Sequence, residues 1–164
     1  TRTATANMIA TIELDDACPE HWSPDFDFCL RVLATACQAA GLDHDVTVSL
    51  RFVDADESQT LNLRYREKNA STNVLSFRAD LPESLRANLT SEPLGDIVIC
   101  PVVVEAEARE QLKTVEDHWT HMLVHGFYHL IGYDHMTEDE SATMEALEIE
   151  CLKKLGINNP YLLV

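Results

Sequence analysis

The sequence predicts an α+β fold: a small mixed sheet of about four strands, packed with about five helices and with a histidine-bearing helix at its centre. Two patterns lead to this prediction. Short segments have the branched or alternating residues of strands, and longer segments between them have apolar residues at helical spacing. No repeat, low-complexity stretch or linker divides the 164 residues, so we expect one domain over residues 1–164. We expect residues 1–7 to lie outside its folded part.

Four short segments are expected to form the strands. Residues 8–14 (MIATIEL) mix branched and apolar side chains. Residues 46–53 (VTVSLRFV) alternate apolar and polar side chains, which is the period of a half-buried strand. Residues 74–77 and 97–100 are short apolar runs that we predict as two further strands.

The first two helices are predicted largely from their ends. Residues 26–40 carry apolar residues at helical spacing, and Gly41 follows as a stop signal. Asp54 is placed to cap the start of the next helix, and Glu57 three residues later completes a pattern like the capping box. We expect this short helix to run to about Arg64.

Two more helices follow the fourth predicted strand. Pro101 suits the first turn of a helix that residues 105–112 continue. Thr114, with Asp117 three residues on, marks the start of a long apolar and histidine-rich helix. This helix is expected to end near Ile131.

The net charge of −16 argues against nonspecific binding to a polyanion, because such binding relies on a basic surface. Many of the acids lie in the last predicted helix, over residues 138–155 and closed by Gly156. Residues 64–78, in contrast, contain Glu67 as their only acid. Four basic side chains there indicate a local basic patch on an acidic body: Arg64, Arg66, Lys68 and Arg78.

The composition favours a cytoplasmic protein without a membrane partner. No apolar run approaches the roughly 20 residues that a membrane-spanning helix needs. The first residues show no basic segment followed by an apolar stretch, so no secretory signal is visible. The five cysteines form no Cys-x-x-Cys pair, and their mostly apolar surroundings are typical of buried reduced thiols: Cys18, Cys29, Cys37, Cys100 and Cys151.

Three histidines predict a metal site. His125 and His129 are four residues apart, so a helix brings them to the same face, one turn above the other. His135 would lie too far along a continuous helix, but Gly132 takes positive φ without steric cost and lets the chain double back. Three neutral imidazoles with an open fourth position form a catalytic zinc site. We expect one zinc ion per chain, and nickel, copper or cobalt would also suit these ligands.

The ligand spacing is that of the metzincin proteases, His-Glu-x-x-His-x-x-Gly-x-x-His. The three histidines and the glycine match, which makes a zincin-like helix the expected centre of the fold. The protease, however, uses the glutamate as the general base for water, and this chain has Gly126 at that position. Peptide hydrolysis is therefore kept only as an alternative.

The same segment, HGFYHLIGYDH over residues 125–135, closely resembles the signature of the YbeY family, bacterial metal-dependent endoribonucleases of ribosomal RNA maturation. Three upstream blocks resemble the family in the same order: LNLRYR at 61–66, TNVLSF at 72–77 and LGDIVI at 94–99. The pattern departs at residues 69–71, where the family commonly has Asp, a variable residue and Pro.

The resemblance implies a zinc-dependent endoribonuclease specific for single-stranded RNA, acting in 3′ end maturation of small-subunit ribosomal RNA and in ribosome quality control. It implies ribosomal RNA and the ribosome or its proteins as partners, and no DNA. It carries over His125, His129 and His135 as metal ligands and Arg66 as the functional arginine. Arginine suits a phosphodiester substrate because its planar fork can pair two phosphate oxygens.

The roles of three nearby residues stay open. Asp134 either orients a ligand histidine, accepts a proton, or only bonds the backbone of the turn. His121 and His118 fall on the same helical stripe as the two helical ligands. His121 is either a packed, hydrogen-bonded residue or a support for the site, and His118 is expected outside the ligand set.

A third hypothesis is a noncatalytic ribosome-associated factor in which the metal holds the fold together. Three ligands rather than four oppose this interpretation, because structural zinc sites are usually closed by a fourth protein ligand.

Overall fold

The computed structural model describes residues 9–86 and 88–162. The expected boundary at residues 1–7 lies outside the described residues, as does the first residue of the predicted strand 8–14. The described chain forms one four-stranded sheet in the order β1-β2-β4-β3. β1 pairs with β2 and β2 with β4 in parallel, and β3 pairs antiparallel to β4 at the edge, so the predicted mixed sheet is confirmed. The strands are β1 (Ala10–Asp16), β2 (Val46–Phe52), β3 (Val74–Arg78) and β4 (Glu92–Ile99).

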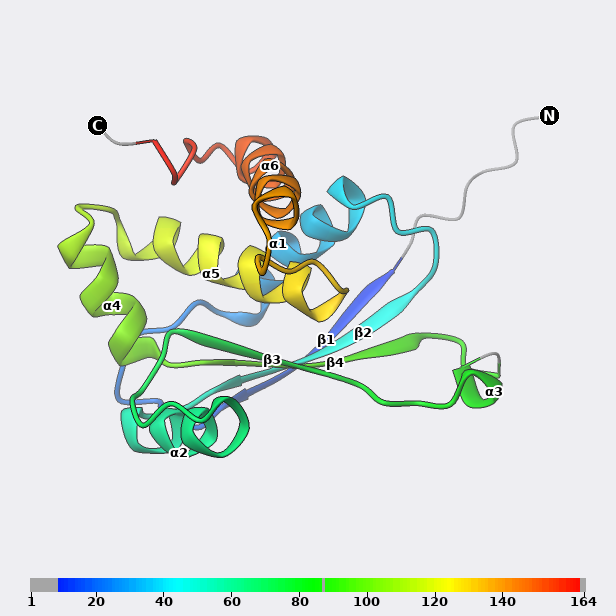
Figure 1. Ribbon diagram of the computed structural model, residues 1–164, viewed down its shortest axis with the longest axis horizontal. Helices are drawn as coiled ribbons and strands as arrows, with labels where there is room; N and C mark the ends of the chain where they lie inside the picture. Colours follow the sequence, from blue (N-terminus) through cyan, green and yellow to red (C-terminus); the bar gives the residue numbers. More distant parts are fainter. Residues whose placement is uncertain (1–8, 87, 163–164) are drawn as a thin grey trace.

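Helices cover the two faces of the sheet unequally (Figure 1). One face carries α1, α4, α5 and α6, and the other carries α2. The described residues form six helices rather than about five, because a four-residue helix, α3, interrupts the connection between β3 and β4. The helices are α1 (Phe26–Ala39), α2 (Ala55–Arg66), α3 (Glu83–Arg86), α4 (Pro101–Glu110), α5 (Val115–Leu130) and α6 (Glu138–Lys154).

Successive side chains of β3 point alternately toward α5 on one face of the sheet and toward α2 on the other. Val74 and Ser76 face α5, whereas Leu75 and Phe77 belong to the small cluster beneath α2. β4 is longer than predicted, because residues 92–96 (EPLGD) are mostly polar, proline or glycine and lack the apolar run of 97–100. Glu92 and Pro93 nevertheless pair with β2, and the residues from Gly95 onward pair with both β2 and β3, so β4 extends back to Glu92.

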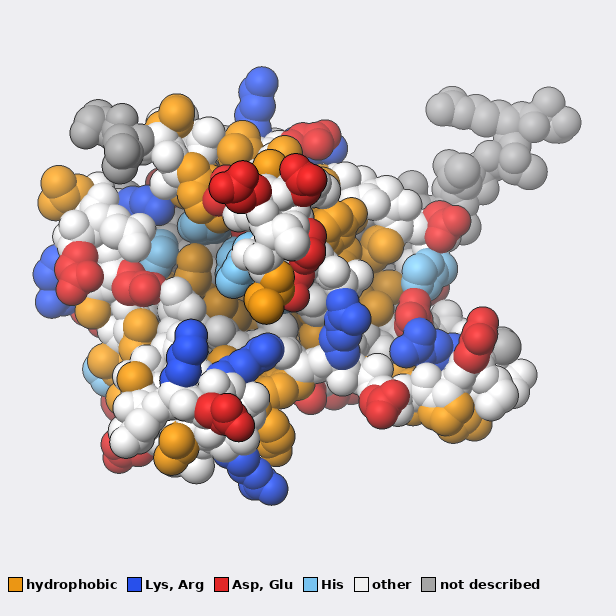
Figure 2. Space-filling model, viewed as in Figure 1, with side chains coloured by type: hydrophobic (Ala, Val, Ile, Leu, Met, Phe, Trp, Pro, Cys, Tyr) orange, Lys and Arg blue, Asp and Glu red, His pale blue; other side chains and the backbone are white. Residues whose placement is uncertain are grey.

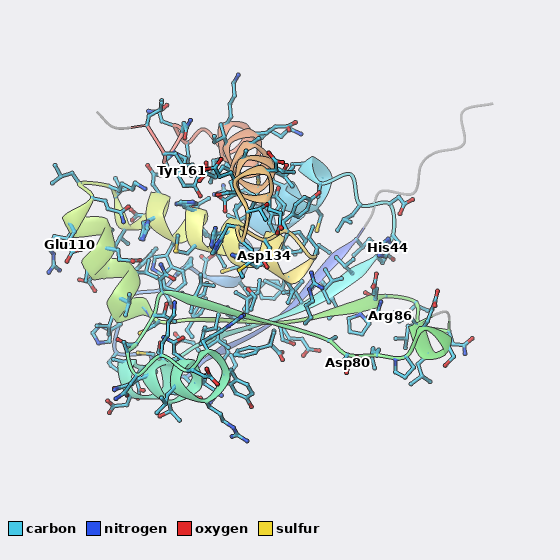
Figure 3. All side chains as sticks on the ribbon, viewed as in Figure 1. His44, Asp80, Arg86, Glu110, Asp134 and Tyr161 are labelled. Carbon is cyan, nitrogen blue, oxygen red and sulfur yellow. The ribbon has the colours of Figure 1, made fainter. Side chains whose placement is uncertain are left out.

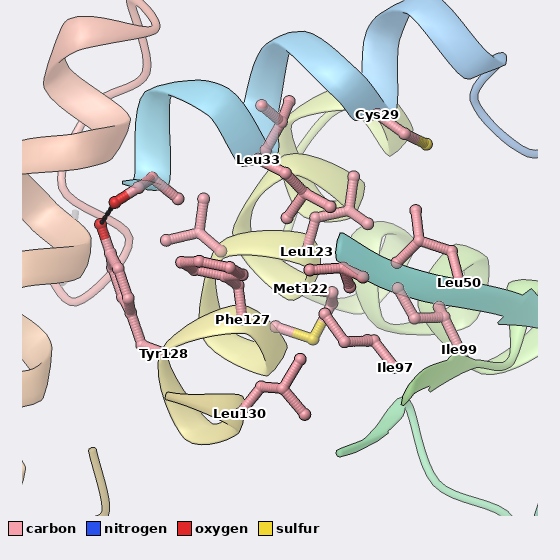
Figure 4. Close-up of a cluster of buried hydrophobic side chains, with 14 of the residues drawn as sticks. Cys29, Leu33, Leu50, Ile97, Ile99, Met122, Leu123, Phe127, Tyr128 and Leu130 are labelled. Atoms are coloured by element: carbon pink, nitrogen blue, oxygen red, sulfur yellow. Dashed lines mark hydrogen bonds between the residues drawn. The ribbon is translucent and has the colours of Figure 1, made fainter. Parts of the chain in front are cut away.

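α5 passes through the main core (Figure 4). Its apolar side chains pack between α1 and the inner face of β2 and β4, and Phe127 and Tyr128 are completely buried. The hydroxyl of Tyr128 donates a hydrogen bond to the carbonyl of Ala36 in α1, at 3.1 Å. This contact fixes the position of α5 relative to α1 near the end where two of the predicted ligands lie.

The predicted helix caps are confirmed. The side chain of Asp54 accepts a hydrogen bond from the backbone N–H of Glu57, and that of Thr114 accepts one from Asp117. α2 runs two residues beyond the predicted Arg64, and Glu67 ends it in the left-handed conformation at φ 60°.

α5 approaches β3 and β4 very closely at Gly126. A Cβ there would lie 2.8 Å from Cγ2 of Val74 and 3.0 Å from Cγ2 of Ile97. The carbonyl of Gly126 accepts a hydrogen bond from Ser76 Oγ at 2.7 Å. The position where a metzincin has its glutamate therefore faces the sheet, with no room for a side chain.

A polar cluster joins α4, α5 and the start of β3. His118 Nε2 lies 3.0 Å from a carboxylate oxygen of Glu107, and Asn73 donates to both carboxylate oxygens at 3.1 and 3.2 Å. Burial raises the pKa of Glu107, but the hydrogen bonds from His118 and Asn73 outweigh it, and the pKa falls below its ordinary 4.5. His118 is thus a packed, hydrogen-bonded residue outside the ligand set, as expected.

The five cysteines are all free and buried, as predicted. Among the described residues, no helix combines the length and the apolar character that crossing a bilayer requires.

We predict that Gly126→Ala destabilises the protein by about 1–3 kcal/mol. Alanine would by itself stabilise a helix by about 1 kcal/mol over glycine. The new methyl group, however, meets stiff β-branched neighbours in Val74 and Ile97. Chemical denaturation measures the difference, and a variant as stable as the parent would contradict the close packing.

Glu107→Gln should lower the free energy of unfolding near neutral pH by about 1–2 kcal/mol, since hydrogen bonds to a charged group are lost. The pKa of Glu107 is depressed in the folded state, so the carboxylate stabilises the fold above the unfolded value and loses this effect as pH falls through the folded value. Denaturation at several pH values should show the gap between parent and variant closing in acid. A gap that widens in acid would contradict this assignment.

Candidate metal centre

His125 and His129 lie one turn apart on α5 and share one face of that helix. Their Nε2 atoms are 3.1 Å apart. α5 ends directly afterwards, and Gly132 takes a φ of 110°. The N–H of Tyr133 then donates to the carbonyl of Tyr128 at 2.9 Å, which turns the chain back over the last turn of the helix. The predicted glycine bend is therefore present.

The bend brings His135 to the two helical histidines. One ring nitrogen from each of the three residues lies within 4.8 Å of the other two. The ring centroid of His135 is 4.9 Å from that of His129 and 6.0 Å from that of His125. Asp134 accepts a hydrogen bond from the backbone N–H of His135 at 2.7 Å, so it bonds the turn's own backbone.

The backbone angle requires glycine at position 132, and the missing side chain also leaves room for the end of Arg78. A Cβ at this position would lie 2.6 Å from Nη2 of Arg78, so the guanidinium fits against the bare backbone of the bend. Arg78 is the last residue of β3, on the same side as Ser76. The end of the edge strand thus contributes a positive charge beside the loop that carries His135.

The other ring nitrogen of His125 is held by a carboxylate that sequence reasoning missed. Nδ1 of His125 is hydrogen-bonded to Oε1 of Glu148, which is completely buried in α6. The hydroxyl of Tyr161 donates to the second oxygen of Glu148, and His121 Nε2 lies 3.5 Å from that oxygen and 3.3 Å from the hydroxyl. His121 is therefore buried and hydrogen-bonded beside the site.

The protonation of this region favours metal binding. Burial and the neighbouring rings of His125 and His135 lower the pKa of His129, which keeps its imidazole neutral near pH 7. Burial also lowers the pKa of His121. Burial raises the pKa of Glu148, but hydrogen bonds from His121, His125 and Tyr161 outweigh it and bring the pKa to about 2.

The residues present fit a divalent transition metal ion. Because Nδ1 of His125 faces a carboxylate, its Nε2 is left with a lone pair that points toward His129. Three imidazole nitrogens form the donor set of a catalytic zinc site. Among the described residues, the buried Glu148 forms ion pairs with histidines alone, and with no lysine or arginine. A cation bound to His125 would offset its charge.

Arg66 lies at the edge of β3, the strand that contacts α5 through Ser76. Arg66 is the last residue of α2, and its Nη2 donates to the backbone carbonyl of Ser76 at 3.3 Å. The amide of Asn62 donates to the carbonyl of Ala70 at 2.8 Å and holds the loop that leads back to β3. Among the described residues, neither Arg66 nor Arg78 forms an ion pair with a carboxylate.

The charges on this face are segregated (Figure 2). Lysine and arginine side chains lie over α2 and along β3, directly below the histidine side chains, whereas acidic side chains gather over α6. Figure 3 places Asp134 just past α5 and Tyr161 in the C-terminal segment beside α6. The histidines thus lie between a basic strip on one side and an acidic helix on the other.

Comparison with known proteins identifies the family. The family model described as "Endoribonuclease YbeY" matches residues 24–156. Curated relatives of that name are 52% identical over 132 residues in Acinetobacter baumannii (80% of this chain, 84% of the relative) and 56% identical over 126 residues in Acinetobacter baylyi (73% and 79%). A third, from Francisella tularensis subsp. holarctica, is 43% identical over 143 residues (87% and 88%).

A solved structure is similar in fold. The solution structure of TM1509 from Thermotoga maritima matches with a TM-score of 0.55 at 24% identity, covering 90% of this chain and 91% of that one. This likeness supports the α+β architecture described above. The family match spans α1 to α6 and therefore includes both the histidine helix and the buried glutamate. The chain belongs to the YbeY endoribonuclease family.

Proposed function

We propose that this protein is a zinc-dependent endoribonuclease that cleaves single-stranded RNA, with His125, His129 and His135 holding the metal ion. Membership of the family supports the endoribonuclease activity. The observation that carries the metal assignment is the convergence of three imidazoles at the bend after α5. We further propose that residues 1–164 act as one domain, in the cytoplasm, on ribosomal RNA and in contact with the ribosome.

The arrangement of the chain around this ion explains how the reaction would be supported. When bound, a divalent ion supplies a Lewis acid that polarises water and a phosphate oxygen. Glu148 is hydrogen-bonded to Nδ1 of His125, and the core holds α5 in place. His129 stays neutral because burial and adjacent rings lower its pKa, so its lone pair remains free for coordination.

Phosphodiester cleavage also needs positive charge near the phosphate, and Arg66 is the residue we propose for it. Its guanidinium is exposed at the edge of β3, and Arg78 adds a second charge beside the bend at Gly132. Both arginines lack a carboxylate partner among the described residues, so their charge is available to a phosphate. A basic strip of this kind also explains how an acidic protein can approach RNA.

The geometry disfavours the two alternatives. A peptidase of the metzincin type would need a carboxylate at position 126, but that position faces Val74 and Ile97 at contact distance. A purely structural metal would usually have a fourth protein ligand, and His135 lies on an exposed loop after the helix.

The direct test is metal analysis of the purified protein together with cleavage of a defined single-stranded RNA. We expect about one zinc ion per chain, cleavage that a chelator abolishes, and recovery when zinc is added back. Single-stranded DNA of the same sequence should remain intact. Unchanged cleavage after complete removal of metal would refute the proposal.

His135→Ala should weaken zinc binding and reduce RNA cleavage by at least about 100-fold, because one of three ligands is lost. The side chain is exposed, so the metal-free protein should keep its free energy of unfolding within about 0.5 kcal/mol. His44→Ala serves as the control, since His44 pairs with Asp43 and Glu92 away from the site. Full cleavage by the His135 variant would exclude this residue as a ligand.

Arg66→Ala is expected to lower turnover of RNA by at least about tenfold while zinc content is unchanged, since the guanidinium acts on the phosphate. Arg64→Ala, two residues earlier on the same helix, is the matched control and should retain most activity. Steady-state kinetics with metal analysis on each sample measure both effects. A parallel loss of zinc and turnover in the Arg66 variant would assign this arginine to the structure instead.

A further inference from the structure

We propose that Glu148 is a positioning residue that fixes the ring orientation and tautomer of His125, and that Tyr161 of the C-terminal segment holds Glu148 in place. The inference rests on the proposed function in one respect, namely that His125 is a metal ligand. It adds two residues, from α6 and from the segment after it, to a site predicted from one helix and one bend.

Placing a carboxylate at this buried position costs free energy. The side chain of Glu148 is completely buried, although an isolated carboxylate is expensive to remove from water. Its two oxygens are divided between partners: Oε1 bonds His125, and Oε2 bonds Tyr161 and approaches His121. Because both oxygens of Glu148 are bound by specific partners, we infer that its negative charge serves to hold His125.

The two ring nitrogens of His125 have different partners. A neutral imidazole carries one proton, and a carboxylate can only accept a hydrogen bond. The proton therefore lies on Nδ1, facing Glu148, and the lone pair lies on Nε2, on the side of His129 and His135. A carboxylate behind a ligand histidine fixes the tautomer in this way and increases the basicity of the coordinating nitrogen.

Tyr161 links the C-terminal segment to this arrangement. Burial and the adjacent Glu148 raise the pKa of its hydroxyl, so it remains protonated and donates to the carboxylate. Its ring lies edge-on to that of His121, with 5.5 Å between the centroids. Tyr161 is 40% exposed, so the segment covers the buried carboxylate from the solvent side.

A second metal ion is the competing interpretation, because His121, His125 and Glu148 also place ligand atoms within 4.8 Å of one another. His125 would then have to give up the proton on Nδ1 and coordinate through both nitrogens. His121 Nε2, His125 Nδ1 and both oxygens of Glu148 already have hydrogen-bond partners, whereas His121 Nδ1 has none. Because the converging atoms are occupied in this way, we interpret the group as the support of a single site.

The test compares three variants. Glu148→Met removes the acceptor behind His125 and should weaken zinc binding by about 10–100-fold, as measured by competition with a chromophoric chelator. Glu148→Gln keeps an acceptor oxygen but not the charge and should lie between Met and wild type. Tyr161→Phe should weaken binding by less than either. Glu150→Gln, on the exposed side of the same helix, is the control and should bind zinc as the parent does.

The ¹⁵N chemical shifts of the histidine rings in the metal-free protein give a second readout that needs neither zinc nor activity. In wild type, His125 should carry its proton on Nδ1, and Glu148→Met should shift the population toward the other tautomer. If Glu148→Met does not fold, the tautomer of His125 in wild type and in Glu148→Gln still tests whether Glu148 positions that ring. A failure of wild type to bind zinc would refute the proposed function but leave the tautomer measurement valid.

Three results would overturn the proposal. The first is zinc affinity of the folded Glu148 variants equal to that of wild type. The second is His125 protonated on Nε2 in the wild-type protein without metal. The third is binding of two zinc ions per chain, with loss of one of them in Glu148→Gln, which would make Glu148 a ligand of a second ion.

Discussion

Two histidines one helical turn apart can hold an ion only if the helix that carries them keeps its position. In this protein, contacts with α1 and with the sheet hold α5 in place. Its apolar face lies in the main core between α1 and the sheet, and Tyr128 bonds the backbone of α1. On the side of β3, Gly126 brings the backbone of α5 into contact with Val74 and Ser76. The remaining face carries the histidines, and its geometry follows from this packing.

Two glycines in the histidine segment perform different tasks. Gly126 has an ordinary helical backbone, and what it provides is the absence of a side chain between α5 and the sheet. Gly132 provides a backbone angle that L side chains rarely adopt, together with room for the guanidinium of Arg78. The histidine spacing is that of the metzincin peptidases. At the position of their catalytic glutamate, however, Gly126 leaves no room for a side chain, and Arg78 adds a positive charge beside the bend.

The patterns that were visible in the sequence are those fixed by local geometry. The face shared by His125 and His129 follows from the helical period, the bend follows from the conformational freedom of Gly132, and the caps at Asp54 and Thr114 follow from side-chain chemistry. These features depend on residues a few positions apart. They were predictable because no distant contact is needed to define them.

Features that depend on tertiary contacts were not predictable in the same way. Glu148 lies 23 residues from His125 in a helix rich in acids. Its helical spacing to Met144, Cys151 and Leu152 places it on the buried face of α6, but this local pattern does not name His125 as its partner. Tyr161 follows the last helix without any motif of its own. The start of β4 lacks strand periodicity, so only its pairing with β2, joined by β3 from Gly95 onward, reveals it as strand.

The central claim is that three imidazoles and no cysteine hold the metal ion, since all five cysteines are buried in the fold. X-ray absorption at the zinc edge of the zinc-loaded protein tests this claim directly. The account predicts three imidazole nitrogens at about 2.0–2.1 Å, one further oxygen, and no sulfur. Sulfur neighbours at about 2.3 Å, or fewer than three imidazoles around the ion, would contradict it.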